Sequence, residues 1–157
     1  MQQRINAREN AGGALKAMFG LVSYLAKSSI ETKLQHLVDF RVSQINGCAY
    51  CLDMHSKDLR SEGETEQRLY ALSAWREAPF YSERERAALA WAEAVTTLDG
   101  QVPDEVFEAA RNEFSEQELI DLTMAVVTIN GWNRISIAFR TEVGTYQPGQ
   151  FGAASGK

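Results

Sequence analysis

The chain of 157 residues is long enough for one domain with a sizeable core, and we expect a single domain over residues 1–157. Hydrophobic residues make up 45% of it, charged residues 24%, and the net charge of -5 argues against nucleic acid as a partner. No basic region precedes an apolar run at the N-terminus, and the longest apolar segment is too short to span a bilayer, so we expect a cytoplasmic protein with no membrane partner.

Helical periodicity runs through the first half of the chain. Apolar residues recur at steps of three and four over residues 15–25 and again over residues 34–45, which indicates two amphipathic helices. The pair Asn46-Gly47 is a helix breaker and ends the second of them. A third helix is predicted to begin there and to continue until the region of Gly63.

The second half of the chain is also helical. A fourth helix is predicted around residues 69–75, and Pro103-Asp104-Glu105 is typical of a helix start. The segments Ser82–Glu85 and Ser115–Glu118 match the capping box, so a long helix should follow each of them. The fold class is therefore an all-α bundle of about six or seven helices. The tail from about residue 144, rich in small residues, is expected to be flexible or to lie on a neighbour.

Both cysteines and one of the two histidines lie in the segment INGCAYCLDMH. On a helix, Cys48, Cys51 and His55 fall within about 60° of arc and so share one face. Unpaired amides at a helix start favour thiolate and lower the pKa of a cysteine there below its free value. Two cysteines at this spacing can also close into a disulfide with little backbone movement. The pattern therefore indicates thiol redox chemistry.

Which cysteine attacks is left open by these residues. Position at the helix start favours Cys48, whereas a histidine four residues further on favours Cys51. Burial as plain hydrophobic residues is the structural alternative. A zinc site is the other alternative, but Cys48 and His55 are about 10.5 Å apart along a helix axis and do not converge. We therefore expect no metal and no cofactor.

His36, the second histidine, lies in the preceding helix. It is about 13 Å from the end of that helix, while His55 is about 12 Å into the next one. An antiparallel hairpin would place both rings at a similar depth, which gives a candidate proton chain of His36, His55, Cys51 and Cys48. The alternative for His36 is a polar residue at a helix interface. No carboxylate is an equally good partner, although Asp39 lies nearby on the same helix.

The segments HLVDFRVSQINGCAYCLDMHSKDLR and TMAVVTINGWNRISIAFR resemble the AhpD-like alkylhydroperoxidases of the carboxymuconolactone decarboxylase superfamily. The resemblance covers about residues 15–142, and CxxCxxxH is its specific part. It implies an AhpD-like helical fold and a thiol-dependent peroxidase acting on hydrogen peroxide or small organic hydroperoxides. By this resemblance Cys51 is the peroxidatic cysteine, Cys48 the resolving cysteine and His55 the proton relay.

One position departs from the family pattern. The relay commonly includes a glutamate twelve residues before the first cysteine, and that position is His36 here, so we expect a working but slower peroxidase. The resemblance also implies a homo-oligomer, a trimer or hexamer, and a dithiol reductant of the lipoyl or thioredoxin type. The alternatives are a dithiol redox sensor, a disulfide reductase with little peroxide turnover, or a non-enzymatic helical scaffold. The decarboxylase of the superfamily works without this cysteine pair, which argues against decarboxylation.

Overall fold

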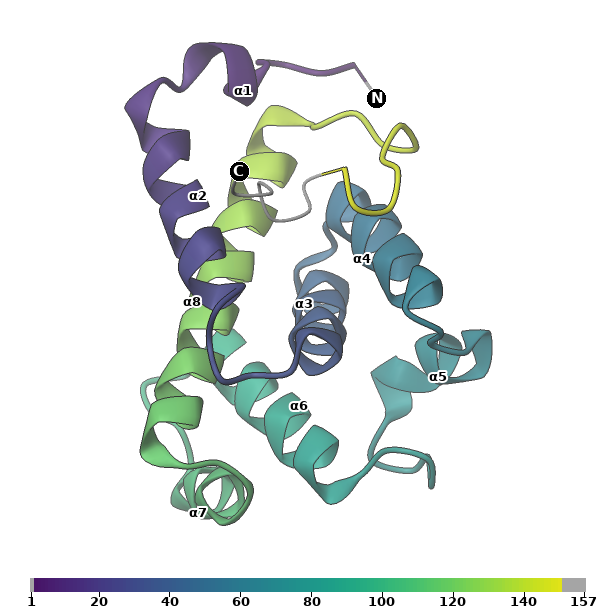
Figure 1. Ribbon diagram of the computed structural model, residues 1–157, viewed down its shortest axis with the longest axis vertical. Helices are drawn as coiled ribbons and strands as arrows, with labels where there is room; N and C mark the ends of the chain where they lie inside the picture. Colours follow the sequence, from purple (N-terminus) through teal and green to yellow (C-terminus); the bar gives the residue numbers. More distant parts are fainter. Residues whose placement is uncertain (1, 151–157) are drawn as a thin grey trace.

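The computed structural model describes residues 2–150, and within this range the chain forms α-helices, one short 3-10 helix (η1) and no strand (Figure 1). The elements are α1 (Ala7–Asn10), α2 (Gly13–Leu25), α3 (Thr32–Asn46), α4 (Ala49–Ser61), α5 (Glu66–Ala71), η1 (Leu72–Ala74), α6 (Glu83–Thr96), α7 (Asp104–Glu113) and α8 (Glu116–Phe139). The all-α prediction is confirmed. None of these helices is both long enough and apolar enough to cross a bilayer.

The seven helices expected from periodicity correspond to α2 through α8, the fourth of them being α5 with its continuation η1. The four residues of α1 were not predicted, because so short a helix has no apolar repeat to detect. Both capping boxes are formed: the hydroxyl of Ser82 accepts from the Glu85 amide, and that of Ser115 accepts from the Glu118 amide. Each satisfies amides at a helix start that have no partner within the helix.

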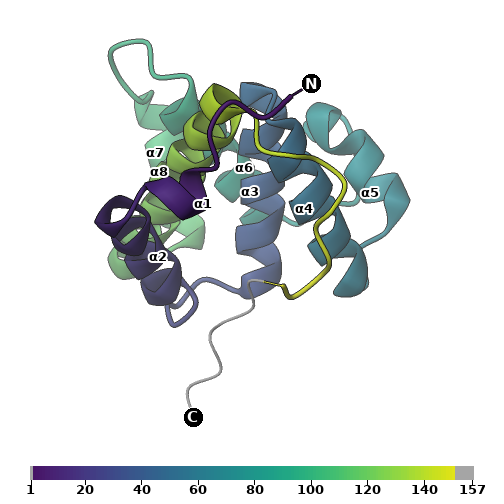
Figure 2. The same ribbon diagram turned by 90° about the horizontal axis from the view of Figure 1, so that it is seen from above.

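Helix α3 is the central element of the bundle and packs against α4, α6 and α8 (Figures 1 and 2). It contributes to both hydrophobic clusters of the core. Its residues Leu34, Val38 and Val42 face α6, α7 and α8 in one cluster. Leu37 and Phe40 belong to the other, together with side chains of α4, α5 and α6. Because the two clusters bury α3 on two sides, packing fixes the positions of the residues on its remaining face.

The segment that follows α8 lies along α4 (Figure 2). Tyr146 is buried there, its hydroxyl donating to Asp58 Oδ1 at 2.7 Å, and Lys57 Nζ donates to the Tyr146 carbonyl at 3.1 Å. The tail from about residue 144 was expected to be flexible or to lie on a neighbour, and its described part, residues 144–150, packs on α4 of the same chain. Residues 151–157 lie outside the described part of the chain.

Replacing the core residue Leu122 by alanine tests the packing of α8. Leu122 is fully buried in the first cluster, so Leu122→Ala should lower the free energy of unfolding in urea by about 2–5 kcal/mol. Ile120 on the same helix is 57% exposed, and Ile120→Ala should change the free energy of unfolding by no more than about 0.5 kcal/mol. Equal losses in the two variants would contradict this placement of α8.

Candidate active site

The turn between α3 and α4 places the cysteine pair. Gly47 adopts a left-handed conformation with φ of 69°, which disfavours any residue with a side chain. The amide of Gly47 donates to the Gln44 carbonyl at 3.3 Å, and that of Cys48 donates to the Ser43 carbonyl at 3.1 Å. The breaker predicted at Asn46-Gly47 is therefore confirmed. The chain reverses here within two residues and begins α4.

A buried polar network ties this turn to α8. The side-chain nitrogen Nδ2 of Asn46 donates to Asn130 Oδ1 and to Asn133 Oδ1, each at 2.9 Å. Asn133, which is fully buried, donates in turn to the Ser43 hydroxyl at 3.1 Å. Asn130 and Asn133, polar residues in the largely apolar helix α8, thus satisfy polar groups at the end of α3. They fix the end of α3 immediately before the first cysteine.

Cys48 and Cys51 form a disulfide across the first turn of α4. Cys48 is the N-cap of this helix, and its sulfur accepts from the Cys51 amide at 3.3 Å. The two Cα atoms are 5.3 Å apart, a normal separation for a disulfide, so the expected ease of closing the pair is confirmed. Both cysteines are 1% exposed to solvent, but only Cys51 lines the adjoining pocket.

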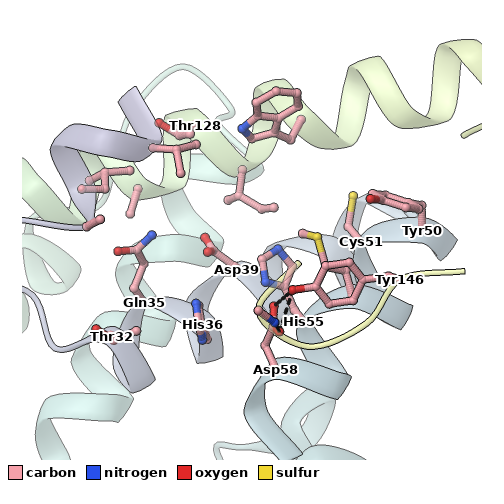
Figure 3. A pocket seen from close by; sticks show the side chains of 18 of the residues that line it. Thr32, Gln35, His36, Asp39, Tyr50, Cys51, His55, Asp58, Thr128 and Tyr146 are labelled. Atoms are coloured by element: carbon pink, nitrogen blue, oxygen red, sulfur yellow. Dashed lines mark hydrogen bonds between the residues drawn. The ribbon is translucent and has the colours of Figure 1, made fainter. Parts of the chain in front are cut away.

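This pocket has a volume of about 490 Å³ and lies between α2, α3, α4 and α8 (Figure 3). One wall, from the α2 and α8 regions, is mostly apolar. The opposite wall, from α3 and α4, carries polar and titratable side chains. The apolar wall is formed by Phe19, Val22, Leu25, Ala26, Ala125, Ile129 and Trp132. A cavity built in this way takes a small organic molecule and presents it to the polar wall.

The two histidines meet in the polar wall, as the hairpin argument predicted. The ring centroids of His36 and His55 are 6.0 Å apart. His36 Nδ1 lies 2.9 Å from Glu62 Oε1, although the geometry is not that of a hydrogen bond. Neither ring nitrogen of His55 has a hydrogen-bond partner among the described residues. Burial, with a smaller effect from His36, lowers the pKa of His55 to about 3, so its imidazole is neutral at pH 7.

Asp39 is a site residue that the sequence interpretation set aside. Its side chain points into the pocket from α3, on the same wall as His36 (Figure 3). Burial raises the pKa of Asp39 to about 8, against a smaller opposing effect of a hydrogen bond from Gln35. The sequence did contain a signal for Asp39. It follows His36 by three residues, and this spacing puts both side chains on one helix face.

Residues distant in sequence form another part of the pocket lining. Tyr146, from the segment after α8, and Asp58, from α4, are joined by a hydrogen bond (Figure 3). Arg8, from α1, donates to the Tyr50 hydroxyl at 3.4 Å. No sequence pattern marks Arg8 or Tyr146, because neither belongs to a motif that contains the other lining residues. Within residues 2–150, no group of three or more His, Cys, Asp or Glu side chains is arranged to hold a metal ion.

The sequence matches one protein family and is similar to a known protein over most of its length. Residues 12–94 match the family described as the carboxymuconolactone decarboxylase family. The uncharacterized protein YdfG of Bacillus subtilis is 45% identical over 139 residues, which cover 88% of this chain and 95% of YdfG. Because YdfG is matched almost from end to end, the likeness extends well beyond the cysteine motif.

One solved structure with a similar fold is ATU0492 from Agrobacterium tumefaciens. It is a protein of unknown function that is named as a candidate antioxidant defence protein AhpD. It has a TM-score of 0.86 and 42% identity, covering 92% of this chain and 100% of that one. The debrominase Bmp8, solved as a cysteine-to-alanine variant in complex with 2,3,4-tribromopyrrole, has a TM-score of 0.76 and 25% identity, covering 87% of this chain and 73% of Bmp8. The AhpD-like helical fold is therefore confirmed.

Asn133→Ala tests the network that anchors the turn. It removes a partner of both Asn46 and Ser43 in a buried place, so it should lower the free energy of unfolding by about 1–3 kcal/mol. Asn112 is exposed on α7, and Asn112→Ala is the matched control, with an expected change within about 0.5 kcal/mol. Urea unfolding of both variants measures the difference. A loss in Asn133→Ala no larger than in the control would show that the network does not support the turn.

Proposed function

The chain belongs to the carboxymuconolactone decarboxylase family, and we propose that it is a thiol-dependent peroxidase that reduces hydrogen peroxide or small organic hydroperoxides through Cys48 and Cys51. The observation that carries the proposal is the position of the disulfide. Cys51 lines a pocket large enough for a small organic molecule, and Cys48 lies behind it within bonding distance. The pair combines a nucleophile that a solute can reach with a second sulfur able to displace the product.

The cycle begins with both cysteines reduced. The Cys51 thiolate attacks the terminal oxygen of the hydroperoxide, so that an S–O bond forms, the O–O bond breaks and the alkoxide leaves as an alcohol after it takes a proton. Cys51 is now a sulfenic acid. The Cys48 sulfur attacks it, an S–S bond forms, and the hydroxyl group leaves as water with one proton. The resulting disulfide is the form seen in the structure, and an external dithiol reduces it again.

In this cycle His55 conducts protons as a neutral imidazole. It lies one helical turn beyond Cys51, lines the same pocket and has both ring nitrogens available. His36 stands where the family commonly has a glutamate, and the carboxylate of Glu62 lies 2.9 Å from its ring. Glu62, at the C-terminal end of α4, thus places a carboxylate next to His36, the position where the family commonly has a glutamate.

The proposed partners follow from the same chemistry. The disulfide needs a dithiol reductant, of the lipoyl or thioredoxin type, and a reducing compartment such as the cytoplasm suits a cycling cysteine pair. The homo-oligomer, a trimer or hexamer, stays a prediction from the family resemblance. A dithiol sensor or a disulfide reductase would use the same pair without appreciable peroxide turnover.

A second candidate function is reductive dehalogenation of a small aromatic compound. Bmp8, with its bound tribromopyrrole, has the same fold over most of this chain, and the apolar wall of the pocket suits a planar ring. In such a reaction the carbon–bromine bond is replaced by a carbon–hydrogen bond, bromide leaves, and the two thiols are oxidised to the disulfide. The electron count is the same as for a hydroperoxide, so one set of variants tests both candidates.

Substituting each cysteine tests the proposed roles. With cumene hydroperoxide and dithiothreitol, Cys51→Ser should lose turnover by more than about 100-fold, because the attacking sulfur is absent. Cys48→Ser should lose multiple turnover but still be oxidised once, to a sulfenic acid on Cys51 that mass spectrometry detects as one added oxygen. The wild-type protein should instead lose two hydrogen atoms per equivalent of peroxide. Ser73→Ala, at an exposed position outside the pocket, is the control.

Other outcomes of this experiment select the alternatives. Disulfide formation without steady turnover would indicate a sensor, and debromination of tribromopyrrole without hydroperoxide reduction would select the second candidate. Equal residual rates in the wild type and both cysteine variants would refute thiol catalysis.

Replacing His36 tests its place in the relay. His36→Ala should reduce kcat/KM for the hydroperoxide at least about threefold, and His36→Glu, which restores the common family residue, should raise it above the wild type. The pH profile of kcat/KM should change in both variants, which a purely structural role would not cause. If kcat/KM falls by less than about one-third in His36→Ala and does not rise in His36→Glu, His36 has no part in the mechanism. Thermal unfolding of each variant controls for folding.

A further inference from the structure

Asp39 is a buried acid that the cycle described above does not use. It is 6% exposed, lines the pocket and forms no ion pair with any residue in the range 2–150. An ionised carboxylate in such a place is costly unless a cation accompanies it, so the group takes up a proton instead. Asp39 is therefore a neutral carboxylic acid at pH 7, which can give its proton away.

Within residues 2–150, none of the groups that line the pocket with Asp39 forms an ion pair with it. From α3 itself come Gln35 and His36, and from α8 and the α2 region come hydroxyl and apolar side chains. The titratable groups that α4 and its C-terminal end contribute to the pocket lining are Cys51, His55, Asp58 and Glu62, with Arg8, Tyr50 and Tyr146 completing the set. The hydrogen bond from Gln35 favours the ionised form of Asp39, and burial outweighs it.

The chemistry of the pocket requires a group that holds a proton between steps. The oxygen that leaves as the O–O bond breaks needs a proton, and its donor must hold that proton at pH 7. His55, whose pKa is lowered to about 3, conducts a proton but does not retain one at pH 7. Asp39, whose pKa is raised to about 8, does retain one. It also lies in the same pocket as the sulfur that would react (Figure 3).

We propose that Asp39 is the general acid of this site, giving its proton to the oxygen that leaves the hydroperoxide and regaining one when the disulfide is reduced. The proposal rests on the peroxidase function proposed above and deepens it. It assigns proton storage to a carboxyl group three residues after His36, with His55 as the conductor between this group and the sulfur.

The proton balance of the step is complete. Asp39 holds its proton when the Cys51 thiolate attacks the hydroperoxide. It regains a proton after each turnover, because an external dithiol that reduces the disulfide releases two protons: one stays on the Cys48 thiol, the other passes to Asp39, directly or through His55, and Cys51 is left as a thiolate. As the O–O bond breaks, the alkoxide takes the proton of Asp39 and leaves as an alcohol. When Cys48 displaces the hydroxyl group, the Cys48 thiol supplies the proton for water.

The test compares Asp39→Asn and Asp39→Glu with the wild type in reduction of cumene hydroperoxide by dithiothreitol. Asp39→Asn keeps the size of the side chain but has no acid proton, so kcat/KM should fall about 10–100-fold. Asp39→Glu should recover part of this loss. The wild-type profile should fall as the pH rises through about 8, where Asp39 ionises, and Asp39→Asn should lack this fall. Asp99→Asn, at an exposed position outside the pocket, is the matched control.

Infrared spectroscopy gives a readout independent of turnover. The protein labelled with ¹³C in its aspartate carboxyl groups should show a band of a protonated carboxylic acid at pH 7, absent in Asp39→Asn and present in Asp99→Asn. The absence of this band in the wild type would overturn the proposal. So would turnover in Asp39→Asn within about twofold of the wild type with the same fall at high pH. A wild-type protein without any hydroperoxide turnover would overturn the proposed function itself, and this role of Asp39 with it.

Discussion

The reversal of the chain at Gly47 determines where both sulfur atoms lie. A left-handed residue at this point ends α3 and begins α4 with Cys48 as its N-cap. The sulfur of Cys48 then turns back to accept a hydrogen bond from the first turn, while Cys51 reaches the pocket. The contacts from Asn133 and Asn130 of α8 hold the preceding turn of α3 in place. The position of the cysteine pair thus depends on α3, α4 and α8 together.

The apolar wall of the pocket controls the proton chemistry of the opposite wall. Low polarity disfavours the charged form of a titratable group, which lowers the pKa of His55 and raises that of Asp39. Both groups are neutral at pH 7 as a result, although one is a base and the other an acid. A site of this kind moves protons without burying net charge. It also places a group of low proton affinity, His55, in the same pocket as a group of high affinity, Asp39, and this difference follows from environment and not from residue type.

Much of the fold could be predicted from local patterns. Apolar spacing and the breaker at Asn46-Gly47 located α2 to α5. The capping boxes at Ser82 and Ser115 placed the starts of α6 and α8, and Pro103 marked the start of α7, because these signals act within one or two turns. The proximity of His36 and His55 followed from counting residues on either side of Asn46-Gly47. The part played by Asp39 could not be foreseen in this way. A single carboxylate on a helix has an ordinary pKa until the elements that bury it are known.

The sequence by itself determined the all-helical fold, the dithiol motif at a helix start and the alignment of Cys48, Cys51 and His55 on one face, because each depends on residues within a few turns of one another. Only the tertiary structure decided which sulfur faces the pocket, how deeply His55 and Asp39 are buried, and that Tyr146 joins the lining. The physical reason is that burial arises from side chains far apart in the chain. Tyr146 contacts a residue of α4 that lies 88 positions earlier in the sequence, and no local pattern records such a contact.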